Sequence, residues 1–120
     1  MADAVDLATF KPGGVDDLAK GILAQLASLL AGKFQDFKQE FGGYVEDVSR
    51  AAIAVASLLA EGIYDKRQAD LALHAQELLI SSAILRAEFL TYELAQSVLE
   101  TIFGVLRSAI RNLTGVDLRF

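Results

Sequence analysis

The side chains whose types could do chemistry lie along one edge of a predicted helix. Asp70, His74, Glu77, Ser81 and Glu88 follow at offsets of 4, 7, 11 and 18 residues from the first, which places them on one side of a helix. They include the only histidine of the chain. Carboxylates and histidines on facing helices can bind a metal ion, as in di-iron bundles, where a Glu-to-His pair three residues apart recurs on two helices.

Three interpretations of this edge are open. For a metal site, the order is reversed, from His74 to Glu77, and the pair occurs once. A second interpretation is a solvated edge on which Asp70 and His74 form a surface pair. The third is a polar layer at a subunit interface, for which Glu88 lies deepest in the apolar stretch; its candidates are His74, Glu77, Ser81 and Glu88. We expect no metal ion and no cofactor.

No pattern in the chain indicates an enzyme. Cysteine is absent, and there is no glycine-rich phosphate loop after a strand, no nucleophile elbow and no Ser-x-x-Lys. The net charge of -5 argues against nucleic-acid binding. The longest uncharged runs, residues 21–32 and 51–60, are shorter than the ~20 residues of a membrane span. With no apolar signal peptide at the start, we expect a soluble, cytoplasmic, non-enzymatic protein without a transmembrane segment.

The elements that would position these side chains are helical. Hydrophobic residues make up 53% of the chain, most of them Ala and Leu, and there is one proline, so we predict an all-α fold. The expected helices cover about 15–31, 33–64 and 67–113, the second kinked near Gly42-Gly43. Residues 15–114 form a single helical domain between a flexible N-terminal arm, 1–14, and a C-terminal tail, 115–120. Whether these arms dock on a neighbouring subunit is left open.

The predicted C-terminal helix is very long. Every seventh residue is apolar through Leu71, Leu78, Leu85, Tyr92, Leu99, Leu106 and Leu113. At this length a helix spans roughly 70 Å, so we expect an elongated helical hairpin or three-helix unit. Residues 65–70 are charged or polar at five of six positions and predict a chain reversal. Because no glycine or proline lies there, one rod from 44 to 113 is the alternative.

The apolar arc of this helix predicts self-association. It covers about half the circumference, and a single partner helix needs only a narrow seam. We therefore expect an oligomeric helical bundle, most simply a homodimer. The expected oligomer interface consists of Leu85, Tyr92, Leu99, Ile102, Phe103, Leu106, Ile110 and Leu113. The sequence thus predicts a structural or adaptor protein whose partner is itself, with another protein as a further possibility.

A stripe of aromatic residues supplies an alternative function. Phe34, Phe37, Phe41 and Tyr44 recur at helical spacing. Such a stripe commonly packs in a core, but it could also line a pocket for an apolar ligand or cover a lipid or granule surface. A carrier or coat protein is therefore the alternative to the self-associating one, and a carboxylate-histidine metal-binding bundle is the third.

Overall fold

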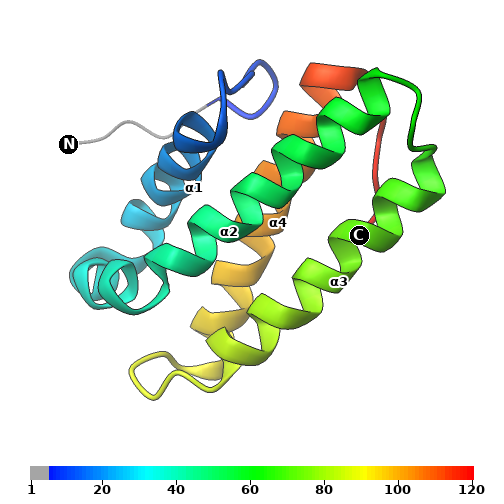
Figure 1. The fold of residues 1–120 in the computed structure, drawn as a ribbon. Coiled ribbons are helices and arrows are strands. Elements are labelled where there is room, and N and C mark those ends of the chain that lie inside the picture. Colours follow the sequence, from blue (N-terminus) through cyan, green and yellow to red (C-terminus); the bar gives the residue numbers. More distant parts are fainter. Residues whose placement is uncertain (1–5) are drawn as a thin grey trace.

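The computed structural model describes residues 6–120, which form an all-α bundle (Figure 1). Its helices are α1 (Val15–Leu30), α2 (Phe34–Ala60), α3 (Lys66–Leu85) and α4 (Tyr92–Thr114), and the short 3-10 helix η1 (Ala31–Lys33) joins α1 to α2. Helix α2 contacts the other three, and α4 also packs against α1 and α3. No strand occurs among the described residues, so the predicted fold class, all-α, is confirmed.

The N-terminal segment is packed on the helices rather than extending as a free arm. Residues 7–9 form a turn, and the Asn112 side chain near the end of α4 donates to the carbonyl oxygens of Leu7 and Phe10, both at 2.9 Å. Phe10 also lies against Gly21 of α1, so closely that a Cβ there would come within 2.6 Å of the ring. Residues 6–14 therefore dock on their own chain; the rest of the predicted arm, 1–5, lies outside the described residues.

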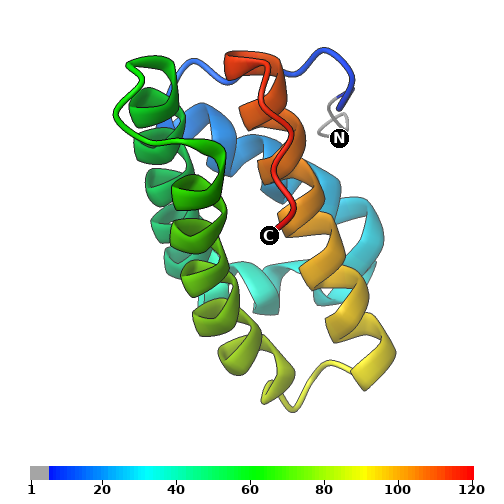
Figure 2. The ribbon, with the colours of Figure 1, turned by 90° about the vertical axis from the view of Figure 1, so that its right-hand side faces the viewer.

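Helix α2 passes through Gly42 and Gly43 without leaving the helical state. In Figures 1 and 2 its first turns point in a different direction from the rest, so the helix bends in its N-terminal part. Its inner face carries the buried side chains of Phe37, Phe41 and Val45. The buried Ser49 hydroxyl donates to the Val45 carbonyl at 2.7 Å. That bond satisfies a polar group that would otherwise be costly to bury.

The chain reverses at residues 61–65. Asp65 caps α3 in a reciprocal capping box: its carboxylate accepts from the Gln68 amide at 2.8 Å, and the Gln68 side chain accepts from the Asp65 amide at 2.9 Å. Gly62 supplies a positive φ of 74° in the turn before it. The reversal predicted from residues 65–70 is present but comes slightly earlier, and most of those polar residues form the first turn of α3. The alternative rod from 44 to 113 is wrong.

The predicted very long C-terminal helix is also wrong, because the chain leaves the helix at residues 86–91. Thr91 caps α4, its hydroxyl accepting from the Leu94 amide at 3.1 Å. Phe89 packs on Phe41 of α2, with ring centroids 6.2 Å apart, and Leu90 is buried. Packing against α2 therefore stabilises a break that no glycine or proline marks, and the longest nearly continuous helical stretch is instead residues 15–60.

This break folds α4 back along the other helices. The radius of gyration is 13.8 Å, close to the ~14 Å of a compact domain of this length. The longest axis measures 42 Å, well short of the span expected for an unbroken helix. The core therefore closes within one chain, with buried side chains from all four α-helices.

Candidate interaction surface

Helix α3 has two apolar faces, of which only one is covered. The inner face consists of Ala69, Leu73, Ile80 and Ile84, which are buried. The outer face, which we call the α3 surface, consists of Leu71, Ala75, Leu78, Leu79, Ser82 and Leu85, all exposed. Leu71 and Leu78 are each 59% exposed and Leu79 is 64% exposed. The leucines together expose on the order of 400 Å² of apolar area, comparable to the largest patch on a typical monomer.

The α3 surface has the spacing of a coiled-coil seam. Leu71, Ala75, Leu78, Ser82 and Leu85 are separated by 4, 3, 4 and 3 residues, the alternation that keeps one line of side chains facing a partner helix. The small residues Ala75 and Ser82 alternate with the leucines, so the backbone of a second helix can come close. The surface is therefore shaped to receive another helix.

Charges lie at the two ends of the α3 surface. Lys66 and Arg67 are exposed in the first turn of α3, and Arg86 and Glu88 are exposed just past its last turn. The Arg86 guanidinium donates to the Ser82 carbonyl at 3.0 Å and so stays close to the helix. Between these ends the line of outer side chains is uncharged, as in the centre of a protein interface.

Most of the predicted oligomer interface lies inside the chain. Leu99, Ile102, Phe103, Leu106 and Ile110 are at most 5% exposed and belong to the core. They are not available to a partner, because α4 folds back onto its own chain. Leu85, Tyr92 and Leu113 are exposed at 42%, 68% and 40%. Of the predicted set, only Leu85 belongs to the α3 surface; Leu71 and Leu78 belong to the seven-residue repeat but were not among the predicted interface residues, and neither was Leu79.

The predicted polar edge is divided among different contacts. His74 Nδ1 lies 2.9 Å from Glu77 Oε1, on a histidine side chain that is 54% exposed. Asp70 does not pair with His74 but accepts bonds from the backbone of residues 119 and 120. Ser81 is half-buried, and Glu88 lies exposed in the segment between α3 and α4 rather than within a helix. A polar layer of His74, Glu77, Ser81 and Glu88 at a subunit interface stays a prediction.

The structure also bears on metal binding and on membrane insertion. Over residues 6–120, no three histidine, aspartate or glutamate side chains gather closely enough to hold a metal ion. None of the helices in that range combines the length and apolar character needed to cross a bilayer.

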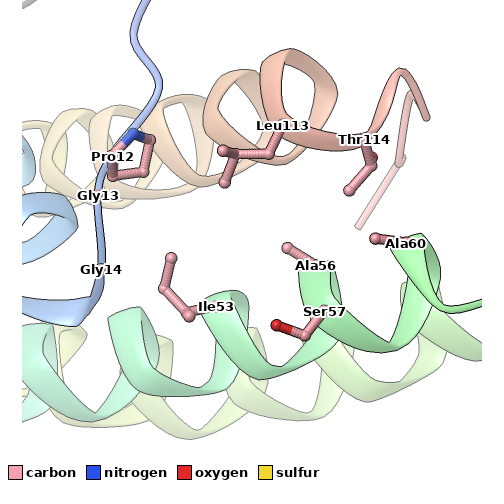
Figure 3. A pocket seen from close by; sticks show the side chains of 9 residues that line it. All are labelled: Pro12, Gly13, Gly14, Ile53, Ala56, Ser57, Ala60, Leu113 and Thr114. Carbon is pink, nitrogen blue, oxygen red and sulfur yellow. The ribbon is translucent and has the colours of Figure 1, made fainter.

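The aromatic stripe is divided between the core and the surface, where pockets of about 350 and 330 Å³ include Phe41 and Phe34, respectively, among their lining residues. Phe37 and Phe41 are buried and pack at 5.2 Å between centroids, whereas Tyr44 is 44% exposed. A pocket of about 270 Å³ lies between residues 12–14, α2 and the end of α4 (Figure 3). Ile53, Ala56 and Leu113 are among its lining residues, and no charged side chain lines it. It is at the small end for a ligand site.

Comparison with protein-family models, with curated proteins and with solved structures gives no match to this chain.

Proposed function

We propose that this protein is a non-enzymatic helical protein that self-associates and acts through its oligomer as a structural or adaptor component. The observation that carries the proposal is the exposed seam of Leu71, Ala75, Leu78, Ser82 and Leu85 on α3. Association lowers the free energy when a second helix covers such a seam, because apolar surface is removed from solvent. The occupant that we propose is α3 of a second copy.

The symmetry of the seam supports an antiparallel pair. Leu71 and Leu85 lie seven residues before and after Leu78, so a two-fold axis at Leu78 would place Leu71 of one copy beside Leu85 of the other. Two-fold contacts of this kind use one patch on both subunits and close the assembly at a dimer.

The charges at the ends of α3 favour the same orientation. In an antiparallel pair, Arg67 of one copy approaches Glu88 of the second copy. In a parallel pair, Arg67 would face Arg67 and Glu88 would face Glu88, so like charges would meet at both ends. Arg86 lies at the same end as Glu88, so the contact between Arg67 and Glu88 gives the antiparallel arrangement only a small advantage.

The area of the surface predicts a modest affinity. Stable interfaces bury ~800 Å² on each partner. The leucines supply about half of that area, with the remainder from flanking side chains such as Arg67, Gln68 and His74. We therefore expect a dimer that dissociates in the micromolar range.

Sedimentation equilibrium across the micromolar range tests the proposal with two matched variants. Leu78→Glu puts a charge at the centre of the seam and should give a monomer with unchanged helicity. Leu29→Glu changes a leucine that is 36% exposed on α1, and it should remain a dimer. A wild-type chain that stays monomeric at high micromolar concentration, or equal dissociation of both variants, would overturn the proposal.

A further inference from the structure

Residues 116–120, which we call the C-terminal segment, lie extended across α3 and α4 (Figure 2). The segment leaves α4 at Gly115, whose φ of 78° turns the chain back. Leu118 and Phe120 are 5% and 8% exposed, whereas Asp117 and Arg119 between them are exposed. Alternate side chains therefore point inward, as expected for an extended chain lying on a surface.

The polar contacts to this segment go to its backbone. Asp70 Oδ1 on α3 accepts from the Arg119 amide at 2.6 Å and from the Phe120 amide at 3.1 Å. From α4, the Arg107 guanidinium donates to the Phe120 carbonyl. Hydrogen bonds to backbone groups do not depend on the sequence of the bound peptide, so these two residues would hold any extended chain placed there.

The side-chain contacts supply selectivity. Phe120 packs edge to face on Phe103, with centroids 6.4 Å apart, and lies under the Arg107 guanidinium at 5.5 Å. Such cation-π and edge-to-face contacts favour an aromatic side chain at this position. Two residues earlier, the site buries Leu118. The site therefore selects an aliphatic residue followed, two positions later, by an aromatic one.

The other contacts that hold the segment are weak. Arg111 Nε lies 4.0 Å from Asp117 Oδ1, and both side chains are exposed. An ion pair of this kind contributes little to the free energy that holds the segment in place. A pocket of about 400 Å³ opens beside the segment, with Gly104, Arg107 and Leu118 among its lining residues. The segment is therefore not enclosed on that side.

We propose that Asp70, Phe103 and Arg107 form a binding site for an extended peptide segment of a partner protein, with an aliphatic and an aromatic residue at alternate positions. The C-terminal segment is the tethered occupant of this site and competes with the partner. The site does not depend on the α3 surface or on self-association. Its ligand is recognised by main-chain hydrogen bonds together with two buried side chains.

The probe is the peptide Val-Asp-Leu-Arg-Phe with an N-terminal fluorescein label and a C-terminal amide, into which the full chain is titrated while fluorescence anisotropy is followed. The control peptide, Val-Leu-Asp-Phe-Arg, has the same composition but breaks the alternation. Leu118→Ser with Phe120→Ser should vacate the site, and Asp117→Ser with Arg119→Ser changes only the outward side chains of the same segment. Because a tethered occupant competes at a high effective concentration, the first variant should bind the probe at least ~10-fold more tightly than wild type or the second variant.

Adding Asp70→Ala to the vacated chain should weaken probe binding about tenfold, since a charged acceptor of two amides is lost. No probe binding by the folded Leu118→Ser and Phe120→Ser chain, or equal binding of both peptides, would overturn the proposal. If the site of the vacated chain bound the wild-type chain instead of the probe, the proposal would also be overturned, because the occupant would then be a second copy.

If the vacated chain does not fold, the wild-type chain provides the test. Millimolar probe should shift the amide NMR signals of Arg119 and Phe120 while the control peptide leaves them unchanged. Unchanged signals with both peptides would contradict the proposal.

Discussion

The Asn112 side-chain amide donates to the backbone carbonyl oxygen of Phe10 at 2.9 Å, a bond between residues 102 positions apart. The same nitrogen also donates to the Leu7 carbonyl. One side chain near the end of α4 therefore fastens the N-terminal segment to the bundle, next to the position where the Phe10 ring covers Gly21.

We expect Asn112→Ala to lower the free energy of unfolding by ~1–3 kcal/mol, because two carbonyl groups lose their donor. Urea unfolding followed by circular dichroism measures the change. Gln96→Ala is the control, since its bond to the Tyr92 hydroxyl lies on the exposed surface, and its effect should stay within about 0.5 kcal/mol. An equal loss in both variants would show that Asn112 has no special role.

Gly21→Ala should destabilise the chain by about 1–3 kcal/mol through overpacking. A Cβ at position 21 would meet the Phe10 ring at 2.6 Å, so the N-terminal segment has to shift. Gly43→Ala is the matched control within α2, where a Cβ meets nothing within 4 Å. That control should stabilise by about 0.5–1 kcal/mol, because alanine favours the helix. Thermal unfolding of the two variants should therefore move in opposite directions.

The N-cap of α4 gives a third prediction. Thr91→Ala removes the hydroxyl that accepts from the Leu94 amide, and we expect a loss of ~1 kcal/mol in the free energy of unfolding. Thr91→Ser keeps the acceptor and should stay close to wild type. Equal loss in both variants would mean that the hydroxyl does not stabilise the start of α4.

Charge reversal tests the orientation of the proposed dimer. Arg67→Glu should raise the dimer Kd about two- to fivefold, because exposed ion pairs contribute ~0.2–1 kcal/mol, and adding Glu88→Arg should restore it. Sedimentation equilibrium at low salt measures both variants. In a parallel dimer, position 67 of one copy faces position 67 of the other, so Arg67→Glu would replace one like-charge contact with another and leave the Kd unchanged. An unchanged Kd in the single variant would therefore contradict the antiparallel arrangement.

Local signals were enough to predict several features. The first helix was expected from about residue 15, and the structure begins it at Val15 with Asp16 and Asp17 in its first turn. Residues 65–70 predicted a reversal, and Asp65 with Gln68 supplies its capping box. These features depend on residues close together in the chain, so sequence reasoning can find them. Thr91 was the comparable signal for the second break, as the only residue of the N-cap type between Ala83 and Glu93.

The candidate site was only partly predictable. The seven-residue repeat contained the exposed Leu71, Leu78 and Leu85, but most of the residues assigned to the interface lie further along, where the structure buries them. A repeat of this kind has the same appearance on a helix that faces its own core and on one that faces a partner. The contacts of Asp70 and Arg107 with the C-terminal segment join residues far apart in sequence and had no local signal at all.

Leu78 and Leu106 show what the sequence determined and what it left to the tertiary structure. They occupy equivalent positions of one repeat, and their sequence context specifies helix at both, yet Leu78 is 59% exposed and Leu106 is fully buried. Helical state follows from local propensity and periodicity, which the sequence carries residue by residue. Which apolar face is covered depends on the break at residues 86–91, where contacts with α2 let α4 fold back, and only the packed structure decides that.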